Sequence, residues 1–67
     1  MINFYFEPGD YVVHSKKKNW GIGQIQTIIG NKITVNFENK GKQVINLSRI
    51  TLKKVDTLEH RRIKTNY

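Results

Sequence analysis

The feature that most constrains the fold is a regular alternation of apolar and polar side chains in residues 32–37. In an extended chain, alternate side chains point to the same face, so the apolar ones share one face. These are Ile33, Val35 and Phe37. The Gly-Asn pair at residues 30–31 comes directly before this segment and is typical of a two-residue hairpin turn. Because another segment rich in β-branched residues precedes the turn at residues 22–29, the sequence predicts a central β-hairpin.

The register of this hairpin predicts an irregularity in its first strand. With the turn at residues 30–31, simple pairing would leave Ile25 on the polar side of the sheet. A β-bulge near residues 26–27 returns Ile25 to the core face. The same bulge places Gly23 under Phe37, whose ring needs a neighbour without a side chain. It also bends the strand, as the closing of a small barrel requires.

Turn residues at short intervals divide the rest of the chain into further extended segments. Strands are expected at residues 11–14, 42–47 and 51–55, with a short turn of helix at residues 48–50. This pattern predicts an all-β domain, a small five-stranded SH3/Tudor-like barrel over residues 1–55 that the last strand closes.

Residues 56–67 are expected to form a basic C-terminal tail that is either briefly helical or disordered. Asp56 and Glu59 have the spacing of a capping box, which favours a helix start. Isolated helices of one or two turns are marginal in water. The tail is therefore expected to fray, or to become ordered only against a partner.

The 67-residue chain contains no cysteine, and its two histidines are His14 and His60. Neither a disulfide nor a zinc site is therefore expected, and no cofactor is predicted. The apolar residues, 37% of the chain, must supply the core. Residues 1–6 lack a basic region followed by a long apolar run, and no stretch is long enough to span a bilayer. We expect a cytoplasmic protein without a membrane partner.

Twelve Lys and Arg residues against five Asp and Glu give a formal net charge of +7, which favours a polyanionic partner. The plentiful Lys, Ile and Asn residues also fit a codon bias toward A and T. The positive charge is therefore explained either by a binding function or by the codon bias, and both interpretations stay open. Net charge bears on non-specific binding and not on fold.

A lysine run beside the single tryptophan is the strongest candidate site. Lys16, Lys17 and Lys18 break the strand pattern and are expected in an exposed loop that ends at Trp20. A cationic loop next to an aromatic platform suits a phosphate backbone with its bases. The alternative is a solvated loop beside a tryptophan that covers one end of the core. The two roles coexist if one indole face stays exposed.

Basic residues toward the end of the chain extend this candidate binding surface. They are Arg49, Lys53, Lys54, Arg61, Arg62 and Lys64. Together they would track the phosphates of a nucleic acid. Each one alone is also explained as solubilising charge.

No catalytic site is predicted, and the chain is not expected to be an enzyme. His14 and Ser15 are adjacent, so in an extended chain they point to opposite faces and cannot act as base and nucleophile. A chain this small is also expected to lack a hollow of about 300 Å³ or more, so no small-molecule substrate is predicted. An aromatic cage of Tyr11, Trp20 and Phe37 is disfavoured because the alternation places Phe37 in the core.

Three groups of residues together resemble a family of short bacterial proteins catalogued as a domain of unknown function. They are Pro8, Gly9 and Asp10 with Val12 and His14, then Trp-Gly-Ile-Gly-Gln-Ile at 20–25, then Ile-Thr-Val-Asn-Phe at 33–37. The likeness covers residues 4–55. More distantly, these residues are similar to the C-terminal Tudor-like domain of UvrD-type DNA helicases and to the RNA-polymerase-interacting domain of CarD-like transcription factors. The resemblance implies an SH3-like barrel that docks onto nucleic-acid machinery.

The expected function is a non-catalytic interaction module, monomeric, that docks onto transcription or DNA-repair machinery. The partner is expected to be a protein of the RNA polymerase or helicase type, or its nucleic acid. One alternative is direct, sequence-independent binding of single-stranded DNA or RNA. Another is a general protein–protein adaptor that uses an exposed strand edge, with the charge incidental. Free strand edges also leave self-association open.

Overall fold

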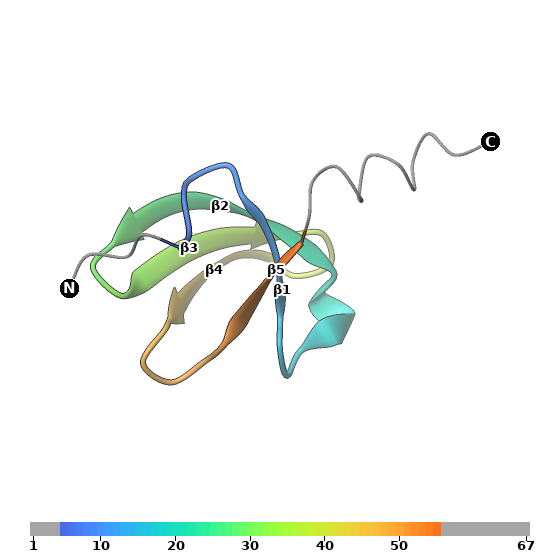
Figure 1. Ribbon diagram of the computed structural model, residues 1–67. Coiled ribbons are helices and arrows are strands. Elements are labelled where there is room, and N and C mark those ends of the chain that lie inside the picture. Colours follow the sequence, from blue (N-terminus) through green and yellow to red (C-terminus); the bar gives the residue numbers. More distant parts are fainter. Residues whose placement is uncertain (1–4, 56–67) are drawn as a thin grey trace.

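The computed structural model describes residues 5–55, and Figure 1 shows them as a single curled sheet with one short helical turn. The elements, in chain order, are β1 (Tyr11–His14), η1 (Lys18–Trp20), β2 (Ile22–Ile29), β3 (Lys32–Phe37), β4 (Gly41–Asn46) and β5 (Leu52–Val55). η1 is a 3-10 helix within the predicted lysine loop. The prediction of an all-β domain is confirmed. Within residues 5–55, no helix is long and apolar enough to cross a membrane.

The five strands form one antiparallel sheet in the order β4-β3-β2-β1-β5. β1 to β4 follow one another as a meander, and β5 returns to pair with β1 over its whole length, from Tyr11 opposite Val55 to His14 opposite Leu52. The sheet is not closed, because no ladder within residues 5–55 joins β4 to β5. The expectation that the last strand closes the barrel is therefore wrong. β5 is only four residues long, and all four of its residues pair with β1.

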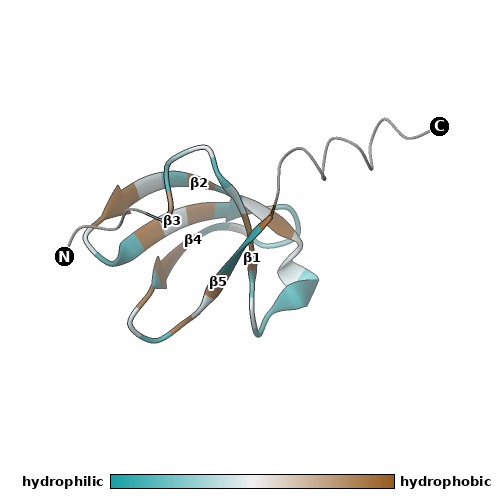
Figure 2. Cartoon of the chain, viewed as in Figure 1, coloured by the Kyte–Doolittle hydropathy of each residue, from teal (hydrophilic) through white to brown (hydrophobic). Residues whose placement is uncertain are grey.

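The predicted bulge is present. The register between β2 and β3 shifts between Ile25 and Thr27, so Ile25 lies opposite Val35 and Gly23 lies opposite Phe37. The extra residue brings Ile25 to the same concave face as Ile28, as the sequence pattern requires. Figure 2 shows the alternation of hydrophobic and hydrophilic positions along β3 that fixes this register.

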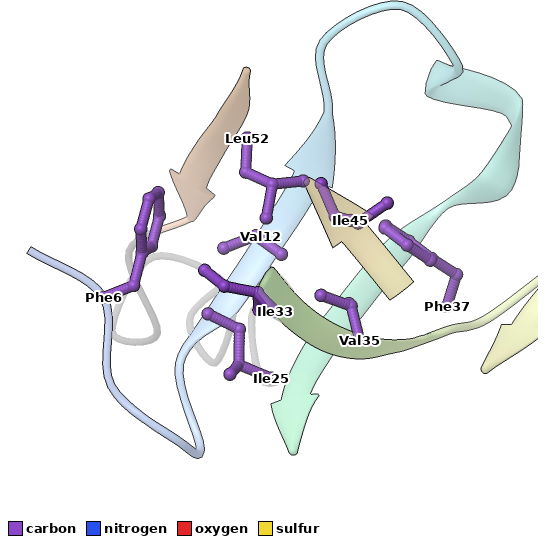
Figure 3. Close-up of a cluster of buried hydrophobic side chains, with 8 residues drawn as sticks. All are labelled: Phe6, Val12, Ile25, Ile33, Val35, Phe37, Ile45 and Leu52. Atoms are coloured by element: carbon purple, nitrogen blue, oxygen red, sulfur yellow. The ribbon is translucent and has the colours of Figure 1, made fainter. Parts of the chain in front are cut away.

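The core fills the concave side of the curled sheet, as Figure 3 shows. Its buried members are Phe6, Val12, Ile25, Ile33, Val35, Phe37, Ile45 and Leu52. Every strand contributes at least one of them. Phe6 comes from the segment before β1, so the core depends on that segment as well as on the sheet. Because curvature alone brings the two edge strands over the same core, the chain buries these side chains without closing a barrel.

The connection between β4 and β5 is a hydrogen-bonded turn and not the predicted turn of helix. The backbone N–H groups of Arg49 and Ile50 both donate to the Asn46 carbonyl oxygen. The Asn46 side-chain Oδ1 accepts from the N–H and the hydroxyl of Ser48, at 3.0 and 2.6 Å. Asparagine thus organises the turn through its own side chain, which competes with helix formation.

Candidate nucleic-acid interface

The β1–η1 loop, the segment that follows β1 up to the first residue of η1, presents Lys16, Lys17 and Lys18 to solvent, as predicted. Its backbone is held by His14, the last residue of β1, which is 3% exposed. The His14 Nδ1 atom accepts hydrogen bonds from the backbone N–H groups of Lys16 and Lys17, both at 3.0 Å. A buried imidazole therefore fixes the path from which the lysine side chains extend.

Both hydrogen bonds require a lone pair on Nδ1, which only the neutral imidazole has. Burial, and then the positive charges of Lys17 and Lys16, lower the pKa of His14. The environment therefore favours the protonation state that the loop needs. His14 thus acts as a hydrogen-bond acceptor at the end of β1.

Trp20 ends η1 and lies half-buried against the core cluster. Its ring makes edge-on contacts with His14, at a centroid distance of 4.9 Å, and with Phe37, at 5.2 Å. The Lys40 ammonium lies over the indole, 5.6 Å from the ring centroid. The prediction that Trp20 covers part of the core is confirmed.

The turn between β3 and β4 is fastened to η1 by hydrogen bonds. The Asn39 backbone N–H donates to the Trp20 carbonyl oxygen at 2.9 Å, and the Asn39 side-chain Nδ2 donates to the Asn19 carbonyl oxygen at 3.2 Å. Gly21, at φ 82°, makes the turn out of η1 in a conformation that favours glycine. This junction brings Lys40 to the indole. Lys40 was not among the site residues predicted from the sequence. We call Lys16, Lys17, Lys18, Trp20 and Lys40 the lysine–tryptophan surface.

The other predicted basic residues are dispersed. Arg49 lies in the turn after Asn46, which pairs with Lys32 at the end of β3 away from Trp20. Lys53 is exposed on β5 opposite Val13. The structure does not bring Arg49 to the lysine–tryptophan surface. Arg61, Arg62, Lys64, His60 and the Asp56–Glu59 capping box lie outside the described residues.

Lys54 has a structural role that its position in the sequence did not indicate. Its ammonium donates to the Tyr5 carbonyl oxygen at 2.8 Å, lies 4.7 Å from the Tyr5 ring centroid and pairs with Asp10 at 3.3 Å. These contacts tie β5 to the segment before β1. Lys54 is therefore already engaged, whereas the lysines of the β1–η1 loop extend into solvent.

An aromatic cage is not formed. Val12 is fully buried, so the neighbouring Tyr11 points to the convex face of the sheet, whereas Phe37 points into the core. Within residues 5–55, no three His, Cys, Asp or Glu side chains lie together as metal ligands. The predicted absence of catalysis stays a prediction.

The convex face carries an open hollow of about 440 Å³. Its lining includes Tyr11, Ile22, Gln24, Asn36, Glu38 and Gly41. The Glu38 Oε1 atom accepts the backbone N–H of Ile22 at 3.0 Å, which holds this carboxylate at one end. The expectation that so small a chain lacks a hollow of ligand size is therefore wrong.

These features define a class of protein: a small all-β domain with one curled antiparallel sheet and a cationic loop beside a half-buried tryptophan. The chain belongs to the family described as "Protein of unknown function (DUF3553)", whose model matches residues 6–55. The family resemblance is thus confirmed over those residues. No curated protein and no solved structure matches the chain. The more distant likeness to helicase and CarD-like domains stays a prediction.

Proposed function

We propose that this chain is a non-catalytic interaction module that docks onto transcription or DNA-repair machinery and contacts single-stranded nucleic acid there. The lysine–tryptophan surface makes the contact. The observation that carries the proposal is the junction of two chain segments at one half-buried indole. The β3–β4 turn places Lys40 over the ring of Trp20, and the exposed Lys16, Lys17 and Lys18 come just before that tryptophan in the chain.

The chemistry of this surface suits a phosphate backbone with unstacked bases. Lysines neutralise phosphates and release counterions, which supplies most of the sequence-independent affinity of such complexes. An exposed indole edge or face supplies a stacking partner that every base accepts. Because Lys40 already lies over the indole, a bound base would displace its ammonium toward the adjoining phosphate.

Docking onto larger machinery is supported by the sequence resemblance to the C-terminal Tudor-like domain of UvrD-type helicases and to the RNA-polymerase-interacting domain of CarD-like factors. A meander of β1 to β4 with β5 returning to β1 is compatible with an SH3/Tudor-like domain. This part of the proposal is an analogy between folds, whereas the contact with nucleic acid rests on the site itself.

A salt titration tests the contact. The full chain is titrated against a dye-labelled single-stranded oligonucleotide at several salt concentrations, and binding is followed by fluorescence anisotropy. Logarithmic affinity is expected to fall with logarithmic salt by about 0.7 for each neutralised phosphate. The variant Lys16→Gln/Lys17→Gln/Lys18→Gln is expected to bind more weakly. The magnitude of its salt slope is expected to be smaller by about 2, because three phosphate contacts are removed. Equal affinity and slope in the two proteins, or no binding at low salt, would contradict the proposal.

A second candidate function, a protein–protein adaptor, is favoured by one observation at the edge of the sheet. β4 is an edge strand, and Val44 within it is 66% exposed. An exposed edge strand with an outward apolar side chain accepts an added strand from a partner. The variant Val44→Lys would block such a partner, whereas the triple lysine variant would not. Capture of the same protein partner by both variants would contradict this second function.

A further inference from the structure

β4 forms one edge of the sheet, because β3 is its only ladder partner within residues 5–55. The Leu47 backbone N–H donates to the Asn31 carbonyl oxygen at 2.8 Å, which fixes the direction of the backbone groups along β4. In an antiparallel ladder, residues that bond to the neighbouring strand alternate with residues whose N–H and C=O groups point the other way. The residues of β4 whose backbone groups point to the open edge are therefore Lys42, Val44 and Asn46.

Val44 combines this open backbone with an apolar side chain in solvent. Its neighbour Ile45 is buried in the core, so Val44 points to the convex face, where it is 66% exposed. Lys42, the one charged residue of β4, is exposed on the same face. An edge strand with open backbone groups and an outward apolar side chain is a template for pairing with another chain.

We infer that β4 pairs with β4 of a second copy of this chain, across a two-fold axis at Val44 that joins the two sheets into one. Antiparallel pairing of identical strands is self-complementary, so it closes as a dimer. The two Val44 residues then lie opposite each other, with Cα atoms about 5.5 Å apart, and exchange both of their backbone hydrogen bonds. Their side chains pack against each other on the convex face. The inference does not rest on nucleic-acid binding, since it uses the sheet edge and not the lysine–tryptophan surface.

The charge of β4 selects this register among the possible ones. An axis at Lys42 would place two lysines directly opposite each other, which is destabilising. An axis at Gln43 would place each Lys42 opposite Val44 and separate the two valines. An axis at Ile45 or Asn46 would shorten the overlap of the two strands. With the axis at Val44, residues 42–46 of both copies overlap, and each Lys42 lies opposite the uncharged Asn46 of the second copy.

The other edge of the sheet fits β4 less well. β5 has four residues and carries Lys53 and Lys54. Pairing of β4 in one copy with β5 in another would bring these lysines alongside Lys42. Such a head-to-tail contact also generates rings or filaments instead of a closed dimer. Charge therefore favours pairing between two copies of β4.

The dimer is expected to be weak and to strengthen as salt is added. Its interface is limited to one strand from each copy, which is less than a standard protein–protein interface. The net charge of +7 on each chain adds repulsion that salt screens. Nucleic-acid binding at the lysine–tryptophan surface has the opposite salt dependence. The failure of either proposal is therefore distinguishable from the failure of the other.

Sedimentation velocity of the full chain, from micromolar to millimolar concentration, tests the dimer. The sedimentation coefficient is expected to rise from that of a monomer toward that of a dimer, and to do so at lower protein concentration in high salt. A monomer at every concentration, the state expected from the sequence, would overturn the inference and leave the edge of β4 to a segment of another protein. Growth beyond a dimer would also overturn it, because the two-fold contact closes.

Opposite charges at position 44 test the axis itself. Val44→Lys and Val44→Glu each place like charges opposite each other in a homodimer, so each alone is expected to weaken self-association about 10-fold. In an equimolar mixture a lysine faces a glutamate across the axis, and the mixture is expected to dimerise more strongly than either variant alone. Because Val44 is exposed, both variants are expected to fold, and their amide spectra check this. No gain on mixing would overturn the inference.

Ile29 supplies the matched control. It is 77% exposed and apolar like Val44, but it lies on β2, which β3 separates from the open edge of β4. Ile29→Lys and Ile29→Glu are expected to dimerise as the wild type does, both alone and mixed. If they weaken self-association as much as the substitutions at Val44, non-specific apolar contact explains the dimer and the inference is overturned.

Amide signals of β4 locate the contact residue by residue. In a dilution series of the isotope-labelled chain, the backbone amide signals of Lys42, Val44 and Asn46 are expected to shift more than that of Ile45, which pairs with Ile33 in β3. In a sample with half of the copies labelled, an intermolecular NOE between Val44 methyl groups is expected. Dilution shifts confined to residues outside β4, or intermolecular NOEs that exclude Val44, would overturn the inference.

Discussion

Gly23 of β2 lies directly opposite Phe37 of β3, and a Cβ atom added to Gly23 would stand 2.7 Å from Cδ1 of the Phe37 ring. The same atom would also collide with Cγ1 of Val35. Phe37 is buried, and its ring also contacts Trp20. A missing side chain therefore lets one ring pack in the core and support the indole of the candidate interface.

Gly23→Ala tests this close approach. Real Cβ atoms essentially never come within 3.0 Å of such neighbours, so Phe37 and Val35 must shift. Overpacking of this kind costs about 1–3 kcal/mol in the free energy of unfolding. Urea denaturation of the variant and the wild type measures the difference. A variant as stable as the wild type would show that the core between β2 and β3 is looser than described.

The buried His14 predicts a loss of stability in mild acid. Its pKa is lowered in the folded chain by burial and by Lys17 and Lys16, whereas in the unfolded chain it titrates near its ordinary value of 6.5. Above that pH both states are neutral and the stability is complete. Below it the unfolded state binds a proton that the folded state excludes, so stability falls as the pH falls toward the lowered pKa.

Thermal unfolding between pH 8 and pH 5 measures this effect. The wild-type Tm is expected to decrease below about pH 6.5. His14→Leu is expected to have a lower Tm at neutral pH, because the N–H groups of Lys16 and Lys17 lose their acceptor, and a flatter profile in acid. His60→Gln serves as the control and is expected to keep the wild-type profile. An unchanged profile in His14→Leu would assign the effect to another group.

Lys40 and Lys54 allow a matched comparison of charge removal inside and outside the candidate interface. Each lies over an aromatic ring, Lys40 over Trp20 and Lys54 over Tyr5. Lys40→Gln is expected to weaken oligonucleotide binding several-fold and to lower the salt slope by about 0.7. Lys54→Gln removes the same charge from a lysine engaged by Asp10 and Tyr5, so it is expected to change binding little. If anisotropy titrations show the same loss of oligonucleotide affinity in both variants, net charge and not the position of the lysine drives binding.

The central hairpin was predictable in detail because burial leaves it a single register. Once the Gly-Asn turn at residues 30–31 is placed, only a bulge brings Ile25 to the core face, and the structure has that bulge between Ile25 and Thr27. The lysine loop was predictable because three adjacent charges cannot be buried together. These elements follow from local pattern and the cost of misplacing a side chain.

Other features depend on contacts between distant segments that carry no local signal. The approach of Lys40 to Trp20 depends on Asn39, whose hydrogen bonds reach across from the β3–β4 turn. The role of His14 depends on backbone N–H groups, which every residue except proline has. The open edge between β4 and β5 follows from strand lengths and curvature. Sequence patterns specify none of these.

Fluorescence of the single tryptophan tests the central claim most directly, because Trp20 lies within the lysine–tryptophan surface. The full chain is titrated with an unlabelled single-stranded oligonucleotide at low salt, and indole emission is recorded. We predict a saturable change in emission that added salt reverses and that the Lys16→Gln/Lys17→Gln/Lys18→Gln variant shows only at higher oligonucleotide concentration. Emission that stays constant throughout the low-salt titration would contradict the claim.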